Sequence, residues 1–141
     1  MLIQINDGRK TYDIQNQDGE IVASVTFNPS NTNILKRADS VADRLDEILK
    51  DIKNMESSSK ALEEKEEEVK RALNDLFCAD VSTPFFNIMG VFSRVGKGQY
   101  FVSQVLEELM NIVKEAQKSD EEASNKRMEE YLADYAEGEP K

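Results

Sequence analysis

The single cysteine is the first residue of this sequence that could do chemistry. Cys78 would act as a nucleophile if a neighbouring base lowered the pKa of its thiol, and histidine is the usual base. The chain of 141 residues contains no histidine. We therefore expect Cys78 to be a small, buried apolar residue. One cysteine excludes a disulfide within the chain and is typical of a reducing compartment.

Acidic residues are a second source of chemistry, because clustered carboxylates can bind metal ions or act as acid–base pairs. Glutamate occupies five of the six positions from 63 to 68, and Lys60, Lys65 and Lys70 flank or interrupt the run. Consecutive positions on a helix point in different directions, and lysines three or four residues away can pair with them. The run therefore predicts a solvated helical face, without a metal site.

The glycines around Lys97 suggest a phosphate-binding loop, but the spacing is wrong. Five residues separate Gly90 from Gly96 where that motif has four, and Gly98 stands where the motif places a serine or threonine. We predict a turn here.

Residues 13–20 resemble a calcium-binding loop only loosely. Alignment of Gly19 with the central glycine of such a loop puts Ile14 at the first ligand position. A β-hairpin explains this segment better. The sequence thus predicts no catalytic residue, metal ligand or cofactor, and we expect that the protein is not an enzyme.

The net charge of the chain bears on which classes of molecule it could bind. The formal net charge is −10, which argues against binding to nucleic acid, because such binding needs clustered lysine and arginine. Residues 79–118 are neutral and apolar, so they are expected to be buried in the fold or against a partner. The first residues do not resemble a signal peptide, and no apolar run reaches the roughly 18–20 residues of a membrane helix. We expect a soluble, cytoplasmic protein that does not bind membranes.

The N-terminal residues alternate between apolar and polar, which predicts a β-meander. The expected strands are Leu2–Asn6, Lys10–Gln15 and Glu20–Phe27, joined by turns at Asp7–Gly8 and Gln17–Gly19. In the third strand one face should pack on the core, and it carries Ile21, Ala23, Val25 and Phe27.

Helical periodicity begins directly after this region. Asn28 or Ser30 can cap a helix from Ser30 to Asn54, and Pro29 suits its start. The apolar face of this helix consists of Ile34, Ala38, Val41, Leu45, Ile48, Ile52 and Met55. A second helical stretch follows from Ala61 to Phe77. The serines between them allow one long rod or a helical hairpin, and we favour a break.

The rest of the chain predicts a short helix over Phe85–Met89 and a long helix from Tyr100. Residues 119–124 either end or fray that helix. Beyond them, Met128, Tyr131, Leu132 and Tyr135 share helical spacing within Lys126–Tyr135, and we expect a separately docking helix there.

Four residues are the candidate partner-binding residues: Phe85, Phe86, Met89 and Phe92. They belong to an aromatic-rich segment between the helices. One interpretation places the segment in the core between the helices. The other leaves part of it exposed as a groove for the apolar helix of a partner protein.

The predicted fold class is α+β and mostly α, with an N-terminal antiparallel β-meander or hairpin followed by a bundle of long helices. We expect one domain over residues 1–135. Its parts are the meander (1–28), two helices (29–77), an apolar connector with a short helix (78–98) and C-terminal helices (99–135), followed by a disordered tail (136–141).

Three segments resemble one protein family. They are Val25–Arg37, the stretch from Leu76–Val81 into Phe85–Phe86, and Arg127–Leu132. Each is similar to tail assembly chaperone-like proteins of long-tailed phages and prophages of Gram-positive bacteria, which are encoded between the tail tube and tape measure proteins. The resemblance implies a non-enzymatic chaperone that binds the long helical tape measure protein before the tail tube polymerises around it.

Two other functions stay open. The chain could be a helical structural subunit of a phage virion or another assembly, or an acidic protein inhibitor or antirepressor that mimics nucleic-acid charge. Lysine and arginine are interspersed between residues 36 and 71, which disfavours the last of these. An exposed apolar seam would also favour a homo-oligomer.

Overall fold

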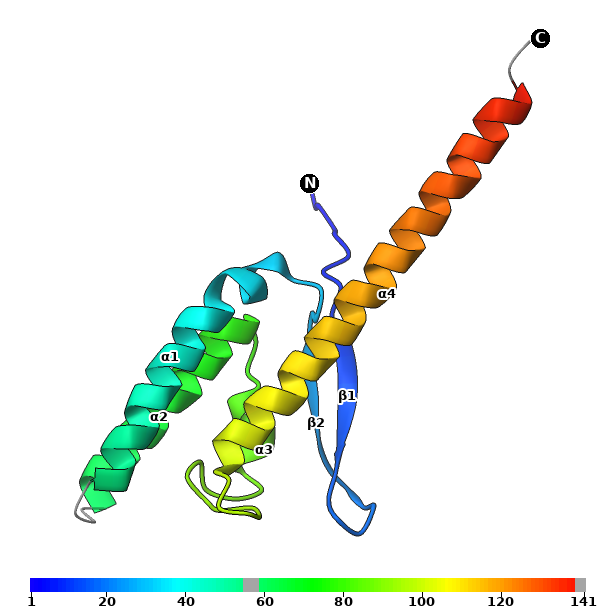
Figure 1. The fold of residues 1–141 in the computed structure, drawn as a ribbon. Coiled ribbons are helices and arrows are strands. Elements are labelled where there is room, and N and C mark those ends of the chain that lie inside the picture. Colours follow the sequence, from blue (N-terminus) through cyan, green and yellow to red (C-terminus); the bar gives the residue numbers. More distant parts are fainter. Residues whose placement is uncertain (55–58, 139–141) are drawn as a thin grey trace.

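The computed structural model describes the backbone of residues 1–54 and 59–138, and side chains as far as residue 133 (Figure 1). The chain forms an antiparallel β-hairpin followed by helices, which confirms the predicted α+β, mostly α class. The elements are β1 (Lys10–Gln15), β2 (Ile21–Phe27), α1 (Thr32–Asn54), α2 (Ser59–Phe77), α3 (Ser82–Phe86) and α4 (Phe101–Gly138).

The hairpin forms because its turn satisfies its own backbone groups. The Asn16 carboxamide oxygen accepts hydrogen bonds from the backbone N–H groups of Asp18 and Glu20, each at 3.0 Å. Gly19 has φ +83°, a conformation that favours glycine. In β2, Val25 and Phe27 are buried and face the helices. The hairpin interpretation of residues 13–20 is thus confirmed.

Two details of the predicted meander are wrong. Residues 2–6 form no strand, so the described sheet has two strands. Ile21 is exposed, although the alternation placed it beside Val25. The reason is an irregularity in the pairing between Ile14 and Gln15, which breaks the period-two alternation at the turn end of β2.

Helix α1 begins two residues later than expected, and Asn31 caps it. The Asn31 carboxamide oxygen accepts a hydrogen bond from the backbone N–H of Asn33 at 3.0 Å. Asn28 instead closes the preceding turn, where its side chain accepts from the N–H of Ser30 at 2.9 Å. The predicted apolar face packs inward. Ile34, Leu45 and Ile48 are buried, and Ala38, Val41 and Ile52 are half-buried against the core. Met55 lies outside the described residues.

Helices α1 and α2 lie side by side as a helical hairpin, so the predicted break is confirmed and the single rod is excluded (Figure 1). Arg44 of α1 forms an ion pair with Glu68 of α2, and Lys65 of α2 lies 3.6 Å from a carboxylate oxygen of Asp51. The guanidinium–carboxylate hydrogen bonds to Glu68 raise the pKa of Arg44. These ion pairs link α1 and α2 at their solvent-facing edges, beside the apolar faces that pack on the core.

The short helix α3 starts earlier than predicted because one side chain of α2 and one of the following turn accept hydrogen bonds from its first backbone N–H groups. The Asn74 carboxamide oxygen accepts from the backbone N–H groups of Val81 at 3.0 Å and Ser82 at 2.9 Å. The Asp80 carboxylate accepts from the backbone N–H of Thr83 at 3.1 Å, and this bond lowers the pKa of Asp80. Pro84 then falls inside the first turn, where its missing N–H costs nothing.

Helix α4 is one continuous helix of 38 residues. The expected separate helix over Lys126–Tyr135 is therefore wrong, because residues 119–124 lack glycine and proline and do not interrupt it. The helix includes residues 136–138, which were expected to be disordered, and residues 139–141 lie outside the described chain. Backbone carbonyls of Ser93 and Val91 accept from the N–H groups of Phe101 and Val102, at 2.7 and 3.1 Å, and hold its start.

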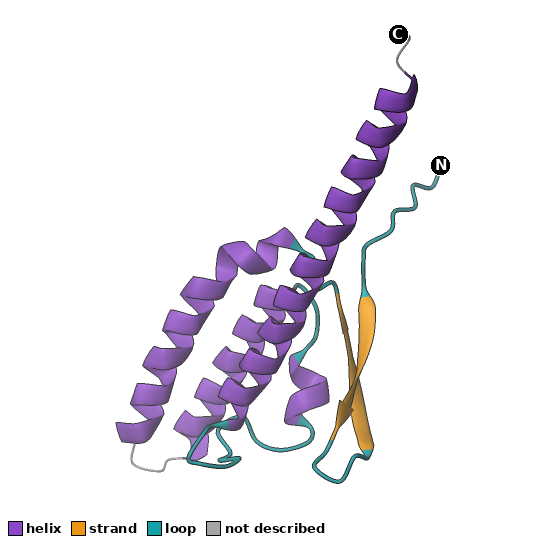
Figure 2. Ribbon diagram, turned by 45° about the vertical axis from the view of Figure 1, so that its right-hand side comes forward, coloured by secondary structure: helices purple, strands orange, loops and turns teal. Residues whose placement is uncertain are grey.

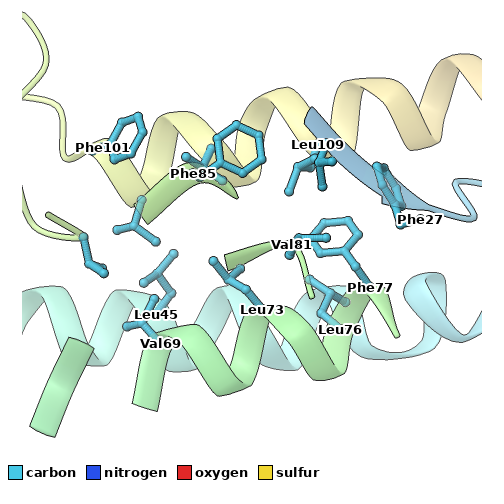
Figure 3. Packing of buried hydrophobic residues seen from close by; sticks show 14 of the residues in the cluster. Phe27, Leu45, Val69, Leu73, Leu76, Phe77, Val81, Phe85, Phe101 and Leu109 are labelled. Carbon is cyan, nitrogen blue, oxygen red and sulfur yellow. The ribbon is translucent and has the colours of Figure 1, made fainter. Parts of the chain in front are cut away.

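The core lies between the α1–α2 hairpin and a layer formed by α4 and the β-hairpin (Figure 2). Phe77 and Phe27 meet edge to face, with ring centroids 5.4 Å apart. Phe85 and Val81 lie between α4 on one side and the α1–α2 pair on the other (Figure 3). Helix α4 contributes Phe101, Val102, Val105, Leu109 and Val113 as buried residues, all from its first half.

Candidate protein-binding surfaces

The four candidate partner-binding residues have different environments. Phe85 is 9% exposed and belongs to the core. Phe86 packs edge to face on Phe101, with ring centroids 5.8 Å apart, and Phe92 packs in the same way on Tyr100 at 6.3 Å. Met89 is 38% exposed. Phe85 is therefore a core residue, Phe86 and Phe92 are half-buried, and Met89 is the one of the four that is exposed.

A groove of about 880 Å³ runs between the β-hairpin, the end of α3 and the first half of α4. Phe85 and Met89 line it, whereas Phe86 and Phe92 do not. Its β1 wall is formed by Tyr12 and Ile14, which are half-buried. Burial raises the pKa of the Tyr12 phenol. The groove is mostly apolar, which suits a segment of protein chain more than a charged small molecule.

Sequence patterns did not identify the walls that β1 and α4 contribute to this groove. Glu108 of α4 lines the same groove as Tyr12 although 96 positions separate them in the chain. Periodicity identifies one inward face for each element, but it cannot say which faces meet at a concave surface. No signal within a single element could have identified this surface.

A second surface is the outer half of α4, residues 121–138. Every described side chain from Lys118 to Ala133 is exposed. Among them Met128, Tyr131 and Leu132 form the stripe that the sequence predicted, with exposed fractions of 59, 66 and 55%. Tyr135 belongs to the same spacing, but its side chain lies outside the described residues. An amphipathic helix with an uncovered apolar stripe is typical of a helix that binds another helix.

The outer half of α4 projects away from the rest of the fold (Figure 1). Asp120 accepts a hydrogen bond from the hydroxyl of Ser30, in the turn that leads into α1. The 18 residues that follow would extend roughly 27 Å at about 1.5 Å per residue. A helix of this length without packing has marginal stability in water. Its apolar stripe is therefore available to a partner.

Cys78 is exposed, so its predicted burial is wrong. It ends α2 with φ +54°, a left-handed conformation that turns the chain and directs the side chain away from the core. Its sulfur lies 3.4 Å from the Arg37 guanidinium and 3.7 Å from the Asp75 carbonyl oxygen. No acid–base partner of the kind used in nucleophilic catalysis is among these contacts.

The glutamates at 63–68 belong to α2; Glu63, Glu64 and Glu67 are exposed, and Glu68 pairs with Arg44 of α1 as well as with lysine. Lys65 and Lys70 lie within 4 Å of Glu68 and Glu67. Within residues 1–54 and 59–133, no three acidic, cysteine or histidine side chains gather in a way that could hold a metal ion.

The glycine-rich segment around Lys97 is a turn, as predicted. Gly96, Lys97 and Gly98 all have positive φ, and the backbone N–H of Val95 donates to the Gln99 carbonyl at 2.9 Å. Arg94 closes the turn from the side, where its guanidinium stacks 3.7 Å from the centroid of the Tyr100 ring.

None of the helices in the described part of the chain is long and apolar enough to cross a membrane. Comparison of the chain with protein-family models, with curated proteins and with solved structures finds no match.

Proposed function

We propose that this protein is a non-enzymatic tail assembly chaperone of a long-tailed phage or prophage, which binds the tape measure protein in the host cytoplasm during tail assembly. The family resemblance of Val25–Arg37, of Leu76–Val81 leading into Phe85–Phe86, and of Arg127–Leu132 supports the proposal. The resembling segments fall on the end of β2 and the start of α1, on the α2–α3 junction and on the outer half of α4.

The outer half of α4 is the observation that carries this proposal. It offers Met128, Tyr131 and Leu132 on one side of a helix that the rest of the fold leaves uncovered. A long helical partner can lay its own apolar face along such a stripe, as in a coiled coil. Methionine adapts to partners of different shape, which suits a chaperone that binds many successive sites on one long protein. Full burial of each stripe side chain would stabilise the complex by about 1.5–3 kcal/mol before entropic costs.

The test is co-expression with the long helical protein encoded immediately downstream, followed by affinity capture and light scattering. We expect retention of several copies of the chain per partner. The double variant Met128→Gln/Leu132→Gln should lose this retention, because it removes the apolar stripe while glutamine keeps a high helix propensity. A soluble partner that never associates with the wild-type chain would contradict the proposal.

The matched control is Lys126→Gln/Glu130→Gln, which places two glutamines on the opposite side of the same helix and leaves the net charge unchanged. It should bind as the wild type does. Equal loss in both double variants would show that helix stability, and not the stripe, determines retention.

Finished phage particles distinguish the chaperone from the alternative of a structural subunit. A chaperone leaves before the tail is complete, so mass spectrometry of purified particles should find at most traces of the chain. Abundant chain in particles would instead favour the structural subunit.

A further inference from the structure

The first six residues form an extended N-terminal arm, residues 1–6, that is not part of the sheet. Its apolar side chains are almost fully exposed: Met1, Leu2, Ile3 and Ile5 have exposed fractions of 121, 98, 90 and 77%. Met1, Ile3 and Ile5 recur at every second position, as on one face of a strand, and the arm contains no charged side chain. An uncovered apolar segment with strand character requires a partner to bury it.

Contacts at Asp7 and Gly8 direct this arm away from its own sheet. The Asn28 carboxamide donates to the backbone carbonyl of Asp7 at 3.0 Å, and Gly8 has φ +72° with Asn28 packed against it. The chain therefore continues past the end of β1 without turning back along it. In both ribbon views the arm leaves the β-hairpin at the end from which the outer half of α4 projects (Figures 1 and 2).

The edge of β1 that faces away from β2 has no strand beside it in the described chain. Consecutive residues from Tyr12 to Gln17 line the groove of about 880 Å³, so the groove runs along the β1 backbone as well as its side chains. Two-stranded sheets are marginal, and a free edge with an apolar groove beside it is a template for a third strand.

We propose that the N-terminal arm of one copy adds to the free edge of β1 in a second copy, as an antiparallel third strand that fills the groove. The register that sets Ile3 opposite Tyr12 also sets Met1 opposite Ile14 and Ile5 opposite Lys10. Opposed residues of an antiparallel pair point to the same face. All three apolar odd-numbered residues of the arm then lie on the face of Tyr12 and Ile14, which is the groove face.

The chemistry of the arm favours a second copy as the occupant. None of its side chains is charged, and Ile3 and Ile5 match the mostly apolar lining that Tyr12 and Ile14 give the groove. The same pairing would arise within one chain if Asp7–Gly8 formed a tight turn, which is the pattern of the sequence. The contacts of Asn28 with Asp7 and Gly8 prevent this tight turn. Exchange of the arm between two identical chains forms the same arm–β1 pairing without requiring the turn. This inference does not depend on the proposed function.

Size-exclusion chromatography with light scattering tests the association. The wild-type chain should elute as a dimer or a larger species. Two chains can exchange arms reciprocally, or each chain can donate its arm to the next in a longer series. Ile3→Ser/Ile5→Ser should give a monomer. The control Leu2→Ser, on the opposite face of the arm, should associate as the wild type does. A wild-type monomer at every concentration tested, or equal association in the Ile3→Ser/Ile5→Ser variant, would overturn the proposal.

A disulfide distinguishes exchange between chains from pairing within one chain. In the Cys78→Ser background, Gln4→Cys and Thr11→Cys place cysteines at opposed positions, where Cα atoms about 5.5 Å apart permit a disulfide. Oxidation should give covalent dimers or larger species on a non-reducing gel. An intrachain disulfide would show that the arm folds onto its own β1, and no disulfide would show that it does not reach β1. Either result overturns the proposal. The control pair Gln4→Cys/Asp46→Cys reports random collision, because Asp46 is exposed on α1.

Discussion

Ser30 donates its hydroxyl hydrogen to a carboxylate oxygen of Asp120, although 90 positions separate the two residues. The bond joins the turn before α1 to the middle of α4. On the N-terminal side of this bond α4 packs against the core through Leu109 and Val113, and on the other side its described side chains are exposed. One continuous helix therefore has a structural half and a half that is available to a partner.

Amide hydrogen exchange should divide α4 at Asp120. We expect amides of residues 121–133 to exchange at least about tenfold faster than those of residues 102–116, because only the latter are held by tertiary packing. Mass spectrometry of the free chain measures this. Uniform protection along α4 would mean that its outer half is already covered. Addition of the helical partner should protect residues 121–133 if the proposed function is correct.

Phe85 and Met89 should differ strongly in their effect on stability, although both line the groove. Phe85→Ala should lower the free energy of unfolding by about 3–5 kcal/mol, because it leaves a cavity between α3 and α4. Met89→Ala should lower it by less than about 1 kcal/mol, since its side chain is partly solvated. Urea denaturation followed by circular dichroism gives both values, and similar losses would contradict this placement of Phe85.

Gly8→Ala should destabilise the fold more than Gly19→Ala. Both glycines have positive φ, so each alanine introduces backbone strain of about 1 kcal/mol. A Cβ at Gly8 would also lie 2.7 Å from the Asn28 side chain, whereas nothing lies within 4 Å at Gly19. Displaced Asn28 would lose its hydrogen bonds to Asp7 and Ser30, which adds about 1 kcal/mol or more. Urea denaturation gives the midpoint of each variant. Equal shifts for Gly8→Ala and Gly19→Ala would show that displacement of Asn28 costs no stability.

Asp80 should make stability depend on pH in the acid range. The hydrogen bond from the Thr83 N–H lowers the pKa of Asp80 in the folded state. The carboxylate therefore stabilises the fold above its ordinary pKa of about 3.9, and this contribution is lost as the pH falls through the lowered value. We expect Asp80→Asn to be less stable than the wild type at pH 7, and the difference to shrink as the pH falls below about 3.9.

Urea midpoints of both proteins at neutral and acid pH measure this difference. Asp46→Asn, on the exposed face of α1, is the control and should show little difference at either pH. A constant difference between Asp80→Asn and the wild type across the pH range would show that the charge of Asp80 is not what stabilises α3.

The elements of this fold could be predicted where the determinants are local. The turn residues Asn16 and Gly19 specify the hairpin, and the apolar faces of α1 and α4 follow from their spacing. The position of the break near the serines was predicted as well. Each of these depends on contacts within a few residues of sequence, or on one face of one element.

The candidate site was only partly predictable, because it depends on contacts between distant segments. The sequence identified the apolar segment but could not rank its residues. Phe85 is buried because α4 covers it, whereas no described element covers Met89 fully. The groove forms only where β1 and α4 lie close together in the fold. The N-terminal arm stays uncovered because Asn28, 20 positions away, packs against Gly8.

The sequence by itself determined the helix-rich class, the hairpin turn, the inward faces of the helices and the apolar stripe at Met128. The tertiary structure decided which apolar residues remained accessible, among them those of the N-terminal arm, Met89 and the outer half of α4. The physical reason is that periodicity reflects the geometry of a single helix or strand. Burial is a property of two surfaces in contact, and the second surface comes from a distant part of the chain or from another molecule.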